Sequence, residues 1–248
     1  MRKISSIFLA TAVLLLSAGS CKKKDTTTPT QPSNTAPSVS TPATADGAFA
    51  AVKVISTQTV AGITIPIDIG TAAAWFGSAS SPVDGGAVTC NTNALSKQGN
   101  NYIFTPTTSA PSGIDFSSSS VNWTIAGNSA NSIPAFNHTD SGSFPSVDDI
   151  SNTGDVDTHT AFTLTAASSV YGDSVIFNIA GPNGNVLKVM PPNTSSCTFT
   201  AAEMGTLGTG NNVGLLQIAP YRVALQVVSG KNYYFVRETC ANKFVTLK

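Results

Sequence analysis

The chain has 248 residues, and its 13 basic and 13 acidic residues give a formal net charge of zero. This balance excludes the electrostatic signature of a nucleic-acid partner. The chain has only two histidines and four cysteines, with no Cys-x-x-Cys spacing, so the sequence predicts no metal centre of the zinc type and no cofactor.

The chain begins with the layout of an export signal. Arg2 and Lys3 give a positive start, and residues 4–20 form an uncharged run of 17 residues with an apolar centre. A helix that crosses a bilayer needs about 20 apolar residues, so a permanent span is the weaker interpretation. The small residues Ala18, Gly19 and Ser20 then stand directly before Cys21.

This arrangement resembles the lipobox of bacterial lipoproteins, although Ala18 stands where leucine is commonest. The resemblance implies a signal peptide over residues 1–20 and a diacylglyceryl group on Cys21, which becomes the first mature residue. The membrane is then a partner through this anchor, at the bacterial outer membrane, facing the periplasm or the cell surface. The alternative is an ordinary signal peptide that is cut nearby and leaves Cys21 as a thiol.

Residues 21–46 are expected to form a tether. Three lysines follow Cys21, and the segment from Asp25 to Ala45 is rich in threonine, contains four prolines and has almost no large apolar residue. Such a segment cannot bury enough surface to fold, so it predicts disorder.

From Gly47 onward the sequence predicts an all-β fold. Residues 62–70 alternate isoleucine with Thr64, Pro66 and Asp68, which is the pattern of a half-buried strand, and the proline favours a sheet edge. The same period recurs at Val121, Trp123 and Ile125, at Val175, Phe177 and Ile179, and at Tyr221, Val223, Leu225 and Val227.

Turn residues separate these runs. We expect connections at 84–86, 182–184 and 229–232, and one short helical turn at 200–204. Many short strands with frequent turns predict an antiparallel β-sandwich.

The length favours two modules. A Gly, Ser and Asp-rich stretch at 141–159 without periodicity suggests a first sandwich over 47–147 and a second over 153–248. The layout of the second resembles an immunoglobulin-like sandwich, although no motif specific to that family is present. A single large sandwich or jelly roll is the alternative.

With Cys21 assigned to lipid, three cysteines remain in an oxidising compartment. Cys197 and Cys240 fall in the same predicted module, so they are the expected disulfide. Cys90 is then a buried thiol.

The acidic stretch at 148–157 offers weak calcium ligands in Asp149, Asp155 and Asp157. Thr160 stands where an EF-hand loop needs its bidentate glutamate, so a solvated acidic linker is the favoured interpretation. Thr26 and Ser174 lie in short patterns that resemble O-glycosylation acceptors of some exported bacterial proteins.

Paired aromatic residues offer a binding hypothesis. Neighbours in a strand face opposite ways, so Trp75 and Phe76 cannot both enter one core, nor can Tyr233 and Tyr234. We therefore predict Trp75 and Tyr234 as ligand-contacting residues that stack on sugar rings. The alternative is packing in a second interface or beneath a loop.

The sequence favours a non-catalytic role. His138 and His159 are the only imidazoles, and no nucleophile elbow is present. Three hypotheses follow: an extracellular module that binds a polysaccharide or protein, an architectural component of a surface assembly, and, as the least favoured, a hydrolase with a dispersed site. A concave aromatic surface would favour the first, an unpaired edge near Pro66 the second, and a histidine beside a carboxylate in a pocket the third.

Overall fold

The computed structural model describes residues 45–60, 63–78, 81–118 and 120–248. The predicted signal peptide, Cys21, Thr26 and the tether up to residue 44 lie outside the described residues. No helix in the described part of the chain is long and apolar enough to cross a membrane.

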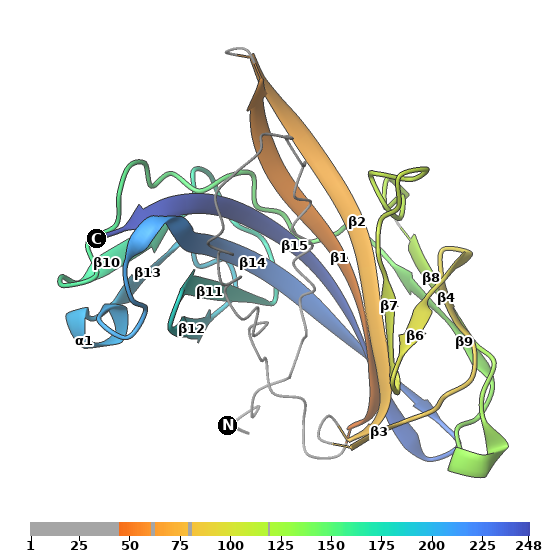
Figure 1. The fold of residues 1–248 in the computed structure, drawn as a ribbon. Coiled ribbons are helices and arrows are strands. Elements are labelled where there is room, and N and C mark those ends of the chain that lie inside the picture. Colours follow the sequence, from red (N-terminus) through yellow and green to blue (C-terminus); the bar gives the residue numbers. More distant parts are fainter. Residues whose placement is uncertain (1–44, 61–62, 79–80, 119) are drawn as a thin grey trace, which may run out of the picture.

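The described elements are mainly strands, with two short helical turns (Figure 1). They are β1 (Ala45–Val60), β2 (Ile63–Ser78), β3 (Ser81–Val83), β4 (Val88–Cys90), β5 (Asn93–Ala94), β6 (Ser96–Gln98), β7 (Asn101–Phe104), β8 (Ser120–Ile125), the 3-10 turn η1 (Ser129–Asn131), β9 (Phe136–Ser141), β10 (Phe162–Thr165), β11 (Ser174–Gly181), β12 (Gly184–Met190), β13 (Ser196–Phe199), α1 (Ala201–Met204), β14 (Gly210–Val228) and β15 (Lys231–Leu247).

One long sheet dominates the fold. Its nine strands follow the order β12-β11-β14-β15-β1-β2-β7-β6, with β3 added beside β2. All of its pairs are antiparallel except β1 with β15, which run parallel and bring Ala50 opposite Val236. Two smaller antiparallel sheets, β5-β4-β8-β9 and β10-β13, complete the all-β structure that the sequence predicts.

The predicted alternation of burial is confirmed in β8, whereas β11 is buried on both faces and Leu225 and Val227 of β14 are exposed. In β8, Val121, Trp123 and Ile125 are buried, whereas Asn122 and Thr124 are exposed. The hairpin between β14 and β15 turns at Ser229 and Gly230, which have φ angles of 52° and 76°. Positive φ values at both central residues suit a tight hairpin that follows the twist of its strands.

The predicted helical turn is also confirmed, as α1. Thr200 caps its N-terminus by accepting a hydrogen bond from the Glu203 N–H at 3.2 Å, and the Glu203 carboxylate accepts one from the Thr200 N–H at 2.8 Å. This reciprocal capping box satisfies two backbone donors that a helix start otherwise leaves unpaired.

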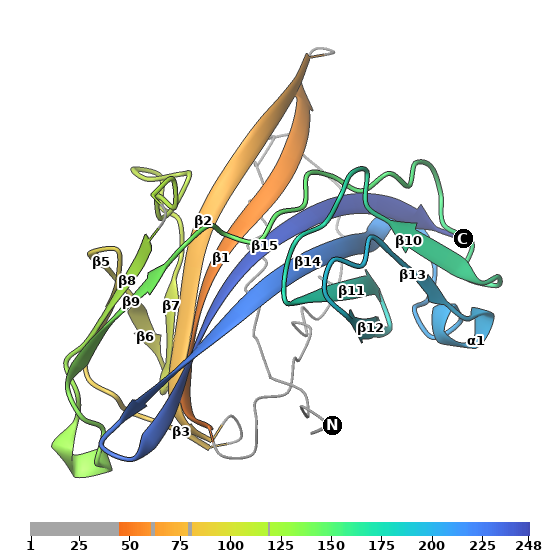
Figure 2. The ribbon, with the colours of Figure 1, turned by 180° about the vertical axis from the view of Figure 1, so that it is seen from behind.

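Two large apolar clusters lie on one face of the long sheet, which we call the outer face. The first, between the long sheet and β4 and β8, is aromatic: Phe49 stacks on Phe235 at 4.7 Å and meets Trp123 edge-on at 5.3 Å. The second lies beneath β10 and β13 and includes Phe177 and Leu164. Figures 1 and 2 show these two covering layers on the outside of a bend in the sheet.

The two predicted modules share this sheet. Leu216 and Ile218 of β14 enter the second cluster, whereas Ala224 and Val228 of the same strand pack against the first. In the strand order of the long sheet, β12, β11, β14 and β15 come from the second predicted module, and β1, β2, β7 and β6 come from the first. The two sets meet where β15 pairs with β1.

The segment predicted as a boundary runs across the outer face and is held there by polar side chains of β15. The Thr239 hydroxyl donates to the Pro145 carbonyl at 2.5 Å, and Lys243 donates to the Ile150 carbonyl at 2.9 Å. Arg237 donates to the Ser141 carbonyl at 3.1 Å and also to the Gly142 carbonyl. These contacts order a segment whose composition alone suggests a loose linker.

Candidate functional site

The opposite face of the long sheet, which we call the inner face, carries a third apolar cluster. Its buried members are Ala50, Val52, Ile176, Ala219, Tyr221, Val236 and Cys240. All of them, and the apolar side chains packed against them, come from strands of the long sheet itself. No other layer among the described residues contributes to this cluster, unlike the two clusters of the outer face.

The inner face also carries both aromatic residues that the sequence singles out. Trp75 of β2 and Tyr234 of β15 are each the register partner of Ala48 in β1, which lies between them. Two strand spacings place their backbones about 10 Å apart. Trp75 is 7% exposed and Tyr234 is partly buried.

The expected separation of neighbours is confirmed. Phe76 and Tyr233 are fully buried in the aromatic cluster of the outer face, whereas Trp75 and Tyr234 lie on the inner face. The pleat of a strand produces this division, because adjacent side chains point to opposite sides of the sheet.

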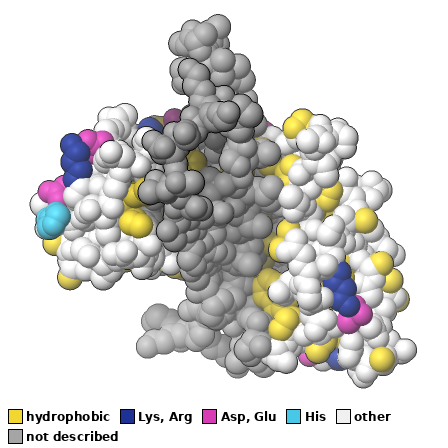
Figure 3. Space-filling view, in the orientation of Figure 1, with side chains coloured by type: hydrophobic (Ala, Val, Ile, Leu, Met, Phe, Trp, Pro, Cys, Tyr) yellow, Lys and Arg dark blue, Asp and Glu magenta, His cyan; other side chains and the backbone are white. Residues whose placement is uncertain are grey.

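Exposed apolar side chains continue the inner face along β14. Leu225, the register partner of Tyr234, is 52% exposed, and Val227 is 60% exposed. Among the side chains that Figure 3 colours by type, few are charged. The partly buried Tyr234 beside the exposed Leu225 and Val227 gives a composition that binding surfaces favour, whereas Trp75 presents little of its ring to solvent.

A row of polar side chains crosses the other end of the inner face. Asn185 donates to the Asn178 carboxamide at 3.0 Å, and Asn178 donates to Gln217 at 3.3 Å. Gln217 donates to the Cys240 sulfur at 2.9 Å, and that thiol donates to Asn242 at 3.1 Å. The sequence alone does not indicate this row, because only the strand register brings these four strands together.

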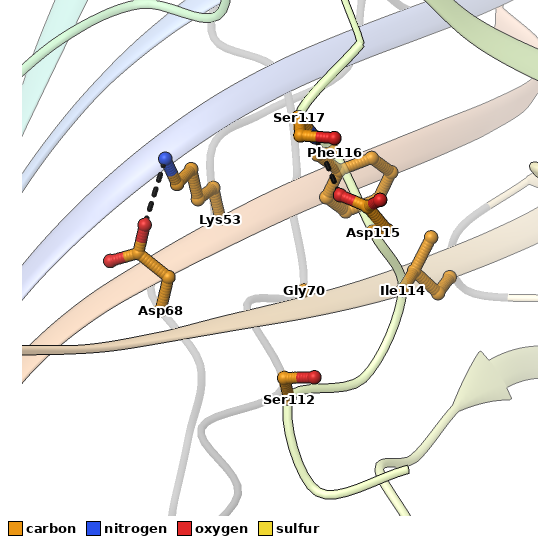
Figure 4. Close-up of a pocket in the computed structure, with 8 residues that line it drawn as sticks. All are labelled: Lys53, Asp68, Gly70, Ser112, Ile114, Asp115, Phe116 and Ser117. Carbon is orange, nitrogen blue, oxygen red and sulfur yellow. Dashed lines mark hydrogen bonds and ion pairs between the residues drawn. The ribbon is translucent and has the colours of Figure 1, made fainter.

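A separate cavity of about 360 Å³ opens on the outer face near the base of the β1 and β2 hairpin (Figure 4). Its lining residues are Lys53, Asp68, Gly70, Ser112, Ile114, Asp115, Phe116 and Ser117. The two strands form one wall, and the loop at 112–117 forms the other.

A close backbone approach holds this loop against β2. The Gly70 N–H donates to the Ser112 carbonyl, and the Ile114 N–H donates to the Gly70 carbonyl, both at 2.9 Å. A Cβ atom on Gly70 would lie 1.9 Å from the Ile114 oxygen. Only glycine fits at this position, so the cavity wall is fixed by the backbone.

The lining of the cavity combines charged and apolar side chains. Lys53 Nζ lies 2.9 Å from Asp68 Oδ2, and both side chains are partly exposed. The Ser117 N–H donates to Asp115 Oδ1 at 2.8 Å, and this hydrogen bond holds the pKa of Asp115 below its usual value. Ile114 and Phe116 are 2% and 8% exposed.

The two histidines lie in different environments. His138 stacks on Phe235 at 3.6 Å, and its Nδ1 lies 2.6 Å from the Gln226 side-chain oxygen; burial lowers its pKa. His159 is exposed beside Asp157, at 3.1 Å. Among the described residues, neither imidazole is hydrogen-bonded to a serine or cysteine side chain.

The predicted disulfide is wrong. Cys90, Cys197 and Cys240 are all free, buried thiols. Cys197 lies in the cluster beneath β10 and β13 on the outer face, whereas Cys240 lies in the inner-face cluster. The sheet separates the two sulfurs, which their shared position in the second predicted module could not reveal.

The three calcium candidates do not converge. Asp149 accepts a hydrogen bond from the Ile150 N–H at 2.7 Å, Asp155 pairs with Lys248 at 2.6 Å, and Asp157 contacts His159. No group of three or more acidic, histidine or cysteine side chains in the described ranges could hold a metal ion.

Ser174, one of the two predicted O-glycosylation positions, lies at the start of β11 opposite Tyr221 and is partly buried. No family model, curated protein or solved structure matches the chain.

Proposed function

We propose that the chain is an exported, lipid-anchored protein that binds an extracellular polysaccharide or protein without catalysis. The juxtaposition of Trp75 and Tyr234 on the inner face is the observation that carries the binding role. The lipobox-like sequence before Cys21 supports the anchor, with the outer membrane as the expected location. An immunoglobulin-like second module is part of this proposal, supported by the two sheets that pack around Phe177 and Leu164.

The inner face supports binding through its chemistry. Aromatic rings supply a large contact area, and their faces accept both sugar rings and apolar side chains. The exposed Leu225 and Val227 extend this surface beyond Tyr234. Binding there would remove apolar area from water, which is the main favourable term in association.

A non-catalytic role agrees with the chemistry of the charged groups. A glycoside hydrolase needs one carboxyl group whose pKa is raised, so that it donates a proton. The Asp115 carboxyl has its pKa lowered instead, and Asp68 is engaged in an ion pair with Lys53.

Two measurements on cells test the anchor and the location. We expect labelled palmitate to be incorporated into the full-length chain and to be lost in the Cys21→Ser variant. We also expect added protease to cleave the protein on intact cells, and protection from the protease would contradict the binding of an extracellular ligand. Unlabelled wild-type protein would remove the anchor from the proposal.

A second candidate function is assembly through the β1 and β2 hairpin, which extends beyond the rest of the sheet in Figure 1. β1 pairs with β15 only as far as Ile55, and β2 pairs with β7 only from Ala72. Beyond these limits, the described strand residues 56–60 and 63–67 pair with each other. Unpaired strand edges are templates for another strand.

The register suggests a specific variant for this second candidate. Thr57 lies opposite Pro66, which has no N–H to donate, so this is not a pair that exchanges hydrogen bonds. The Thr57 N–H therefore faces the outer edge of β1, and Thr57→Pro should block strand addition while keeping the hairpin. Analytical ultracentrifugation of each protein, alone and mixed with candidate partners, measures assembly. If wild type and variant both sediment as monomers in every mixture, assembly through this edge is ruled out.

A further inference from the structure

We propose that the outer-face cavity between the β1 and β2 hairpin and the loop at 112–117 binds one neutral sugar ring. This site lies on the opposite side of the sheet from Trp75 and Tyr234, so it is independent of the binding surface proposed above. If the cavity binds no sugar, the proposal for the inner face is unaffected. If the inner face binds no ligand, the proposal for the cavity is unaffected.

The shape of the cavity is set before any ligand arrives. The hydrogen bonds from and to Gly70 fix the loop, and Gly113 approaches equally closely, because a Cβ there would lie 2.0 Å from the Gly70 oxygen. The Asp115 carboxylate is oriented by the Ser117 N–H. A preformed site loses less conformational entropy on binding.

The polar groups match the hydroxyls of a sugar. A carboxylate has about four lone-pair positions, so one ion pair at Asp68 and one N–H bond at Asp115 use only part of their capacity. Sugar hydroxyls donate to such oxygens, and they accept from donors such as the Lys53 ammonium. Figure 4 shows Lys53 and Asp68 on one side of the cavity and Asp115 with Phe116 on the other.

The apolar part and the charge narrow the ligand class further. Ile114 and Phe116 line the cavity and offer apolar contact to the C–H face of a ring. Two carboxylates against one ammonium leave a formal charge of −1, which disfavours anionic ligands. A fully apolar ligand would instead displace the water that solvates the remaining lone pairs of the two carboxylates. A volume of about 360 Å³ suits one ring.

Saturation-transfer NMR on the full-length protein in detergent micelles tests the site, with glucose, N-acetylglucosamine and glucuronate as probes. We expect saturation of at least one of the two neutral sugars, with glucuronate weaker. The variants Asp115→Asn and Asp68→Asn should each weaken binding by about tenfold, because each removes a charged hydrogen-bond acceptor. Asp155→Asn, far along the chain in an exposed ion pair with Lys248, is the matched control and should bind as wild type does.

Three results would overturn the inference. These are no saturation of either neutral sugar, glucuronate bound as well as they are, and unchanged binding in the two cavity variants. If Asp115→Asn alters folding, Asp68→Asn decides the question alone, because its side chain is half exposed and its loss should leave the melting temperature unchanged.

Discussion

Trp75 and Tyr234 lie on either side of Ala48 on the inner face, although 158 residues separate them in the sequence. Their sequence neighbours Phe76 and Tyr233 meet on the outer face, with ring centroids 6.4 Å apart. The same strand register therefore places one aromatic pair in the main core and the other on the face for which we propose binding.

Removing one partner of the ion pair between Arg237 and Asp140 should destabilise the fold strongly. Its charged atoms lie 2.7 Å apart, and the two side chains are 7% and 11% exposed. We expect Arg237→Ala to lower the free energy of unfolding by about 3 kcal/mol, because it leaves a buried carboxylate without its partner. Urea denaturation measures this. Lys248→Ala, which breaks an exposed pair, is the control and should unfold as wild type does.

The stability of the fold should depend on the charge of His138. Burial lowers the pKa of this imidazole below its usual 6.5, against smaller raising effects from Gln226 and Asp140. The unfolded chain therefore binds the proton more readily, so stability is complete above 6.5 and falls as the pH drops through the lowered folded value. His138→Gln should lose less stability than wild type between about pH 7 and about pH 5. Parallel curves for the two proteins would contradict this assignment.

Tyr102 should stabilise the turn before β4. Its hydroxyl donates to Asp84 at 2.5 Å and accepts from the Gly85 N–H at 3.0 Å. Burial, followed by the bond to Asp84, raises the pKa of Tyr102 to about 12. We expect Tyr102→Phe to cost about 1 kcal/mol of unfolding free energy, since the Gly85 donor loses its partner. A variant as stable as wild type in urea would show that water replaces the hydroxyl.

The cysteines should behave as inert thiols. Cys90, Cys197 and Cys240 are at most 5% exposed, and burial raises the pKa of each. In the Cys21→Ser variant, we expect a thiol reagent to find no reactive group in the native protein and three after denaturation without a reductant. A single thiol after denaturation would instead indicate a disulfide that the structure does not contain.

Local sequence patterns predict part of this fold well. The strands around Trp123, Phe177 and Val223, the turn at Ser229 and the helix at Glu203 follow from residue types within a few positions of each other. Their periodicity and turn chemistry act locally, so a single sequence is sufficient to identify them.

The rest depends on which distant strands become neighbours. Nothing near Ala50 indicates that it pairs in parallel with Val236, and this pairing joins the two predicted modules. Cys240 lies on the inner face of the sheet and Cys197 on the outer face, which is why the predicted disulfide does not form. The cavity likewise needs Lys53 and Asp115 from separate segments. By contrast, the sequence does predict that Trp75 and Tyr234 lie on the face opposite to Phe76 and Tyr233, because alternation along a strand alone places neighbouring side chains on opposite faces.

Ligand capture by the inner face is the decisive experiment. The full-length wild-type protein and the Trp75→Ala/Tyr234→Ala double variant would be screened side by side against immobilised glycans and matrix proteins. Because Trp75 is 7% exposed, its truncation should lower the melting temperature, so circular dichroism at the screening temperature establishes that the double variant is still folded. We predict that wild type retains at least one ligand and that the double variant loses it by about tenfold or more. Undiminished binding by the double variant, or no binding by wild type, would contradict a ligand surface on the inner face.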